Sequence, residues 1–178
     1  MLIALAVTAQ LLVARPPSDT VPPAPPPPPQ GRVKAVEVSD WYARRLTIHR
    51  YTSYAMIPTF AFQWAAGMQI WDKGMQAPPW ARKGHRIGAA TIATAFTVNA
   101  VTGAWNLWDS RHTSEGRARR YIHTLSMLTA SAGFTWAGAK LSNEAEGNPD
   151  KRALHRKVAL TSMGITAVSG VLMRFLND

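Results

Sequence analysis

Four long stretches without a charged side chain dominate the chain after residue 46. They cover residues 51–71, 87–108, 121–139 and 158–173. Each is close to the roughly 20 residues that a helix needs to cross the hydrocarbon core of a bilayer. The last stretch is the shortest, but the long side chain of Arg174 can reach the membrane surface, so its helix can continue to Leu176. The pattern predicts four membrane-spanning helices within residues 47–178.

A soluble four-helix bundle is the alternative to a membrane domain. Each helix of a soluble bundle needs a charged outer stripe, and none of the four stretches has one. Tryptophans lie mostly toward the ends of the stretches, as is typical of the membrane interface. They are Trp64, Trp71, Trp80, Trp105, Trp108 and Trp136. We therefore predict an all-α protein, an integral membrane up-down four-helix bundle.

Short charged connectors separate the four predicted helices, at residues 72–84, 109–120 and 140–154. Because these connectors are short, neighbouring helices are expected to be antiparallel. The segment before the first helix, the second connector and the C-terminus then share one side of the membrane, which we name side A. The other two connectors share side B. Lys and Arg divide almost equally between the sides, so the positive-inside rule does not orient the protein.

The region before the predicted bundle has three parts. Residues 1–14 are apolar but too short to span a bilayer, and they resemble a signal peptide or a short anchor. Residues 15–32 hold most of the prolines, which predicts a disordered, extended arm. Residues 33–46 include Trp41 and Tyr42 and predict an amphipathic helix at the membrane interface.

Charge and cysteine content narrow the function classes. The net charge of +10 suits nucleic acid, anionic lipid or basic loops beside membrane helices. Because the cations gather between the apolar stretches, we favour basic loops and predict no nucleic-acid partner. The chain has no cysteine, which excludes disulfides, thiolate zinc sites and iron–sulfur clusters. A multi-pass protein of a bacterial inner membrane is the expected location.

Four of the five histidines each stand at the start of one apolar stretch. Alternating helix direction places His49 and His123 on side A, and His85 and His155 on side B. The first and third helices, and likewise the second and fourth, are diagonal partners in an up-down bundle. Two imidazoles that face each other across a bundle can supply both axial ligands of a haem iron. The fifth, His112, lies in a connector and is expected to be an exposed loop residue.

The neighbours of these histidines suit a flat anionic macrocycle. One turn along each helix the residues are small: Thr52, Ser53, Gly88, Ala89, Ser126 and Ala159. Cations at the same depth are candidates to pair with haem propionates: Arg45, Arg50, Arg86, Arg120, Arg156 and Lys157. The positive end of each helix dipole favours the neutral, ligating imidazole. The alternative role for His and Arg here is to anchor helix ends among lipid headgroups.

These residues resemble the cytochrome b561 superfamily over residues 47–176. The resemblance rests on the four histidines and on the His-Arg pairs at 49–50, 85–86 and 155–156. It implies two b-type haems, one near each membrane face, and electron transfer across the membrane. It also implies a redox donor and acceptor, with quinone, an ascorbate-like reductant or a redox protein as candidates. Members of the superfamily usually carry their ligands deeper in longer helices, and this chain departs on both points.

The sequence contains no nucleotide-binding loop and no nucleophile–base pair, so it predicts an electron carrier or oxidoreductase subunit without its own substrate-converting site. Trp64, Phe96, Phe134 and Trp136 are expected at mid-bundle, as core residues or packed between the haems. The alternative function is a haem-free membrane scaffold, or a docking subunit of a larger complex. Both functions are compatible with a homodimer or a larger membrane assembly.

Overall fold

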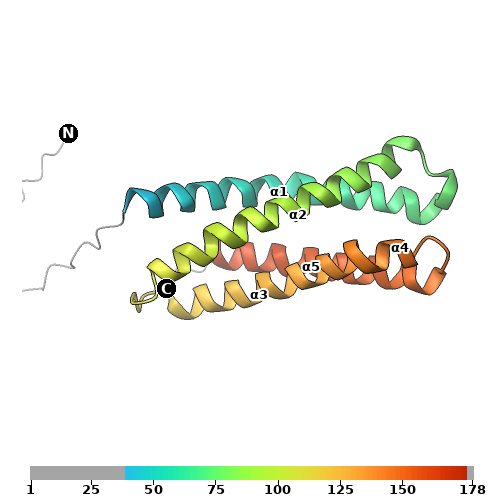
Figure 1. The fold of residues 1–178 in the computed structure, drawn as a ribbon. Helices are drawn as coiled ribbons and strands as arrows, with labels where there is room; N and C mark the ends of the chain where they lie inside the picture. The colour runs from blue at the N-terminus through green and yellow to red at the C-terminus, as the bar shows by residue number, and fades with distance from the viewer. Residues whose placement is uncertain (1–38, 176–178) are drawn as a thin grey trace, which may run out of the picture. The chain divides into compact units, whose positions relative to one another are not determined.

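The computed structural model describes residues 39–175. The predictions for residues 1–14 and 15–32, and for the first part of 33–46, lie outside the described residues. The described part is helical and contains no strand (Figure 1). Its four long helices are α1 (Asp40–Lys73), α2 (Pro79–Asp109), α3 (Arg117–Trp136) and α5 (Pro149–Phe175). Three short elements complete it: the 3₁₀-helix η1 (Gly74–Gln76), the π-helix η2 (Ala137–Leu141) and α4 (Ser142–Glu144).

Local signals explain where the helices begin and end. The Ser39 hydroxyl accepts a hydrogen bond from the backbone N–H of Tyr42 at 3.2 Å and so caps α1. Gly74 ends α1 with a φ of 54°, a backbone conformation that glycine adopts without steric cost. Pro79 occupies the first position of α2, where a missing N–H costs nothing. The side chain of Asn148 accepts two backbone N–H groups and caps α5.

The four helices form two antiparallel hairpins. α1 packs along α2, and α3 packs along α5, whereas contacts between the hairpins are few (Figure 1). One hydrophobic cluster joins the hairpins, and its buried members are Met56, Ile92, Phe96 and Ala130. Phe134 of α3 lies against Phe96 of α2 with ring centroids 5.1 Å apart, and against Phe60 of α1 at 5.6 Å. The predicted core positions of Phe96 and Phe134 are therefore confirmed.

The two tryptophans predicted at mid-bundle lie elsewhere. Trp64 is 54% exposed and Trp136 is 45% exposed, so both point away from the core. They belong to a large set of exposed apolar side chains that includes Ile57, Leu125 and Leu128. The prediction failed because, on a helix whose outer surface is also apolar, hydrophobicity does not distinguish the inner from the outer face.

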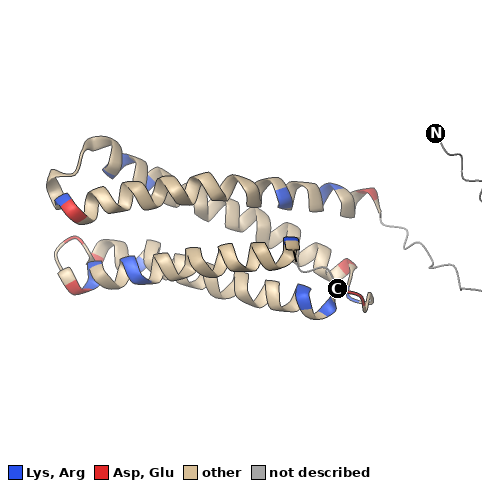
Figure 2. Cartoon of the chain, turned by 180° about the vertical axis from the view of Figure 1, so that it is seen from behind, with Lys and Arg blue, Asp and Glu red and all other residues tan. Residues whose placement is uncertain are grey.

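Polar residues are common in the interior. The buried polar side chains are Gln63, Asn99, Thr102, Asn106, Ser162, Thr166 and Ser169. Charged residues, in contrast, gather near the two ends of the hairpins, and most of the length between the ends carries none (Figure 2). Of the described helices, α2 and α5 are long and apolar enough to cross a membrane. Composition thus supports membrane spans for two of the four helices predicted to have them.

The helices begin earlier than the apolar stretches suggest. His49 is the tenth residue of α1, while His85, His123 and His155 are each the seventh residue of their helices. The histidines therefore lie about 9–14 Å from the helix starts. This corrects the expectation that they open the helices, and it removes the helix-dipole argument, because that effect fades within the first turn. Residues 40–46 form the first turns of α1 and are continuous with it.

Candidate functional site

Two histidine pairs connect the hairpins, one toward each end. The rings of His49 on α1 and His123 on α3 have centroids 6.2 Å apart, with an interplanar angle of 69°. The rings of His85 on α2 and His155 on α5 are also 6.2 Å apart, at 57°. Each hairpin contributes one histidine to each pair, so the structure brings together the residues that the sequence predicted as partners. His112 is exposed in the turn after α2, as expected.

The distance between the ring centroids of each pair can be compared with the distance expected when two imidazoles bind one metal ion between them. A metal–imidazole bond is about 2.0 Å long. A ring nitrogen lies about 1.1 Å from its centroid, because bonds of about 1.35 Å close a five-membered ring. Two imidazoles on opposite sides of one iron would therefore have centroids about 6.2 Å apart. Both pairs have this spacing, so the residues present fit a bis-histidine haem iron.

Two ligands from the protein are what such an iron needs, because the macrocycle supplies the other four nitrogens. Within residues 39–175, no group of three or more His, Cys, Asp or Glu side chains gathers as a metal site. A metal held by protein ligands alone, as in structural zinc sites, is therefore not indicated for this part of the chain. Ligation of a haem by the pairs remains a prediction.

A backbone carbonyl fixes the tautomer of His155. Its Nδ1 lies 2.9 Å from the carbonyl oxygen of Ala137. A carbonyl oxygen only accepts, so Nδ1 carries the proton and donates, and Nε2 keeps the lone pair that a metal needs. Ala137 is the first residue of the π-helix η2, and single-turn π-helices recur at functional sites.

The hydroxyl of Thr102 fixes the tautomer of His49. The Thr102 hydroxyl donates to the carbonyl oxygen of Val98 at 2.8 Å, so its oxygen accepts the Nδ1–H of His49 at 3.1 Å. Nε2 of His49 is again the nitrogen with the free lone pair. Neutral imidazole is the ligating form.

The other two histidines differ from each other in their support. Nδ1 of His123 lies 2.8 Å from the Ser169 hydroxyl. Nδ1 of His85 is buried and has no hydrogen-bond partner within residues 39–175. The nearby Gln63 amide donates from Nε2 to the backbone carbonyl of His85 at 3.0 Å, while its own Oε1 is also buried without a partner. Nδ1 thus contacts a hydroxyl in two of the rings and a carbonyl in the third, and it has no hydrogen-bond partner among the described residues in the fourth.

Each histidine ring lies beside a small residue on the other helix of its hairpin. A Cβ atom added to Gly103 would lie 3.2 Å from Cε1 of His49, and one added to Gly67 would lie 3.4 Å from Cε1 of His85. In the second hairpin, Ser169 and Ala137 occupy the corresponding places beside His123 and His155. The approach at Gly103 is tighter than ordinary contact, so a larger side chain there would press on the His49 ring. The small residues are therefore part of the candidate site.

A spacing that sequence reasoning missed could have identified the small residues. The pattern His-Arg-x9-Phe-x6-Gly covers residues 49–67 and recurs over residues 85–103. In α3 the His–Phe spacing recurs between His123 and Phe134. Because the three phenylalanines, at positions 60, 96 and 134, form the aromatic cluster between the hairpins, the pattern places this cluster between the two pairs.

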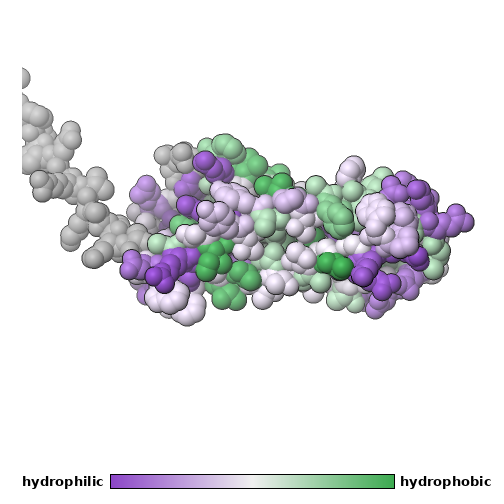
Figure 3. All heavy atoms as spheres, turned by 90° about the horizontal axis from the view of Figure 1, so that it is seen from above, coloured by the Kyte–Doolittle hydropathy of each residue, from purple (hydrophilic) through white to green (hydrophobic). Residues whose placement is uncertain are grey.

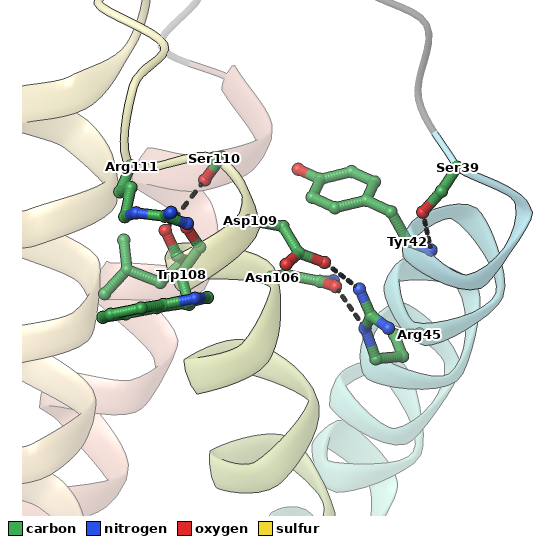
Figure 4. Close-up of polar contacts among 9 residues, drawn as sticks. Ser39, Tyr42, Arg45, Asn106, Trp108, Asp109, Ser110 and Arg111 are labelled. Carbon is green, nitrogen blue, oxygen red and sulfur yellow. Dashed lines mark hydrogen bonds and ion pairs between the residues drawn. The ribbon is translucent and has the colours of Figure 1, made fainter.

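The six predicted propionate partners divide into two groups. Arg45 forms an ion pair with Asp109 and donates to Asn106 at 2.9 Å (Figure 4). Arg120 donates to backbone carbonyls of the loop before α3, and Arg156 lies over the ring of Trp71 at 4.6 Å. The remaining three are exposed and have no ion-pair or hydrogen-bond partner among the described residues: Arg50, Arg86 and Lys157. These three are the better candidates for a bound anion.

Comparisons of the chain with protein-family models, curated proteins and solved structures gave no match. The interpretation of the histidine pairs therefore depends on their geometry and on the chemistry of the residues around them.

Proposed function

We propose that this protein carries electrons across a membrane through two b-type haems, one near each membrane face. His49 and His123 would hold one haem, and His85 and His155 the other. The observation that carries the proposal is the equal ring spacing of 6.2 Å at both ends of the described helices. A haem bound at each pair would supply a one-electron redox centre. The resemblance to the cytochrome b561 superfamily supports the same function.

The distribution of polarity supports a position within the bilayer for all four long helices. Large apolar side chains are exposed along the helices, among them Ile57, Leu128 and Val168 at 61–68% exposure. Seen from the side of α1 and α2, the hydrophilic atoms gather at the two ends and the surface between is mainly apolar or neutral (Figure 3). In water such an apolar surface would be covered by a partner, whereas in lipid it is already solvated. Buried small and polar residues are also typical of helix contacts in membranes.

The separation of the two pairs suits opposite membrane faces. Within α1, the position of Gly67, which contacts His85, lies 18 residues after His49. Ala137, the residue of η2 that follows α3 and contacts His155, lies 14 residues after His123. These separations correspond to about 21–27 Å along the helices. The hydrocarbon core is about 30 Å thick, so one pair would lie near each of its faces.

The residues around the histidines would orient the ligands and exclude water. The hydrogen bonds from His49 to Thr102 and from His155 to Ala137 hold each ring in the tautomer that has a free lone pair on Nε2. The phenylalanine cluster would exclude water from the space between the pairs. Exclusion of water is one of the factors that set the reduction potential of a haem. Arg50 and Lys157 would pair with propionates at the membrane faces.

The proposal is tested by the reduced-minus-oxidised absorbance spectrum of the purified protein. The wild type should show the paired bands of six-coordinate b haem, with about two haems per chain. His49→Ala and His85→Ala should each lose about one haem, because each removes one axial ligand. His112→Ala is the matched control and should keep both, since His112 lies exposed in a turn. Wild-type protein without haem, or full absorbance in both ligand variants, would rule out the proposal.

A further inference from the structure

The start of α2 holds a shallow, open hollow of about 410 Å³, and three of its five lining residues are cations. Its lining residues are Pro79, Arg82, Lys83, Arg86 and Ile87. The three cations are exposed, and within residues 39–175 none of them has an ion-pair or hydrogen-bond partner. Arg45 in contrast is paired with Asp109, and Lys151 with Glu144. The hollow is therefore an unneutralised positive site at one end of the hairpins.

A second hollow, of about 480 Å³, adjoins the first and shares Ile87 with it. Its lining residues are Thr52, Ile87, Ala90, Thr91, Thr94, Ala95 and Val98, and none is charged. The hydroxyls of Thr91 and Thr94 donate to the carbonyls of Ile87 and Ala90 at 3.0 Å, so these threonines expose mainly methyl groups. From Ile87 to Val98 the hollow extends about 16 Å along the helix.

We propose that the two hollows together bind one anionic phospholipid. The cations at Arg82, Lys83 and Arg86 match a phosphate headgroup in charge. The groove from Ile87 to Val98 begins at these cations and continues toward the middle of α2, which is the direction that an acyl chain takes from a headgroup into the bilayer. This inference rests on the membrane position in the proposed function, but it does not depend on haem binding.

The charge and the shape of the site each exclude another occupant. A neutral phospholipid would leave three cations without a counter-charge next to the bilayer. A free phosphate ion would satisfy the cations but would leave the apolar groove unfilled. An anionic headgroup joined to an acyl chain uses both parts.

Native mass spectrometry of the full chain in a neutral maltoside detergent tests the proposal. Phosphatidylglycerol is titrated into the micelles, with phosphatidylcholine of the same acyl chains as the neutral comparison. The wild type should retain one phosphatidylglycerol preferentially. The double variant Arg82→Gln with Lys83→Gln should weaken this binding about 30-fold, because each cation near an anionic headgroup contributes about fivefold. The matched control, Lys73→Gln with Lys140→Gln, removes two exposed charges outside the hollow and should retain the lipid.

A second pair of variants tests the groove without a change of charge. Thr94→Trp fills the groove and should also weaken phosphatidylglycerol binding, whereas Thr97→Trp adds the same ring at an exposed position outside it. Equal loss in the two charge variants, equal binding in the two tryptophan variants, or equal retention of both lipids would overturn the proposal. The haem spectrum of each sample is recorded in parallel. Selective lipid binding by a protein without haem would contradict only the proposed function. Haem binding without lipid selectivity would contradict only this inference.

Discussion

The two histidine pairs have the same spacing but different support. On side A, both Nδ1 atoms form hydrogen bonds with side-chain hydroxyls, those of Thr102 and Ser169. On side B, His155 rests on the backbone carbonyl of Ala137, and Nδ1 of His85 has no partner among the described residues. The distance between the two rings of a pair is therefore set by the helix packing, which is the same at both ends. The hydrogen bonds to Nδ1 differ between the ends and do not change this distance.

This difference has a consequence for electron transfer under the proposed function. A hydrogen bond from Nδ1–H to an acceptor makes the imidazole a more basic ligand, which stabilises oxidised iron and lowers the reduction potential. With Nε2 of each ring on the iron, Nδ1 carries the proton, so side A would have two such bonds and side B would have one. The two haems should therefore have different potentials, with the higher potential at the His85–His155 pair. A redox titration of the wild type should resolve two components.

The largest expected effect comes from the glycines that adjoin two of the rings. In Gly103→Val, the branched side chain would push the His49 ring, which a Cβ would already approach to 3.2 Å. The side A haem should be lost and the side B haem kept. Gly67→Val should do the reverse, because its contact is the ring of His85. Haem content per chain, measured with the reduced spectrum, checks both variants.

Gly164→Val is the matched control for the glycine variants. A Cβ added at Gly164 meets no atom within 4 Å, so this helical glycine can accept a side chain without displacing a neighbour. It should keep both haems. Loss of both haems in Gly103→Val, with the helical circular dichroism unchanged, would show that the two ends are not independent and would contradict the comparison above.

A smaller effect is expected from the hydrogen bond to His49. Thr102→Val keeps the shape of the side chain but removes the acceptor of the Nδ1 proton. Loss of such an outer partner typically weakens metal affinity 10- to 100-fold. The affinity of side A for haem should fall in that range, and its reduction potential should rise toward that of side B. Thr97→Val changes an exposed threonine of the same helix and should alter neither quantity.

The sequence was sufficient to predict the histidine pairing, because alternating helix direction alone decides which end each histidine joins. It was not sufficient to locate the helix starts. The charged residues from Arg82 to Arg86 look like a connector, yet they form turns of α2 that extend beyond the apolar stretch. Nor did hydrophobicity show which side faces inward: Gln63 and Asn99 are buried, whereas Trp64 is exposed. The π-helix at Ala137 has no evident signal in the local sequence.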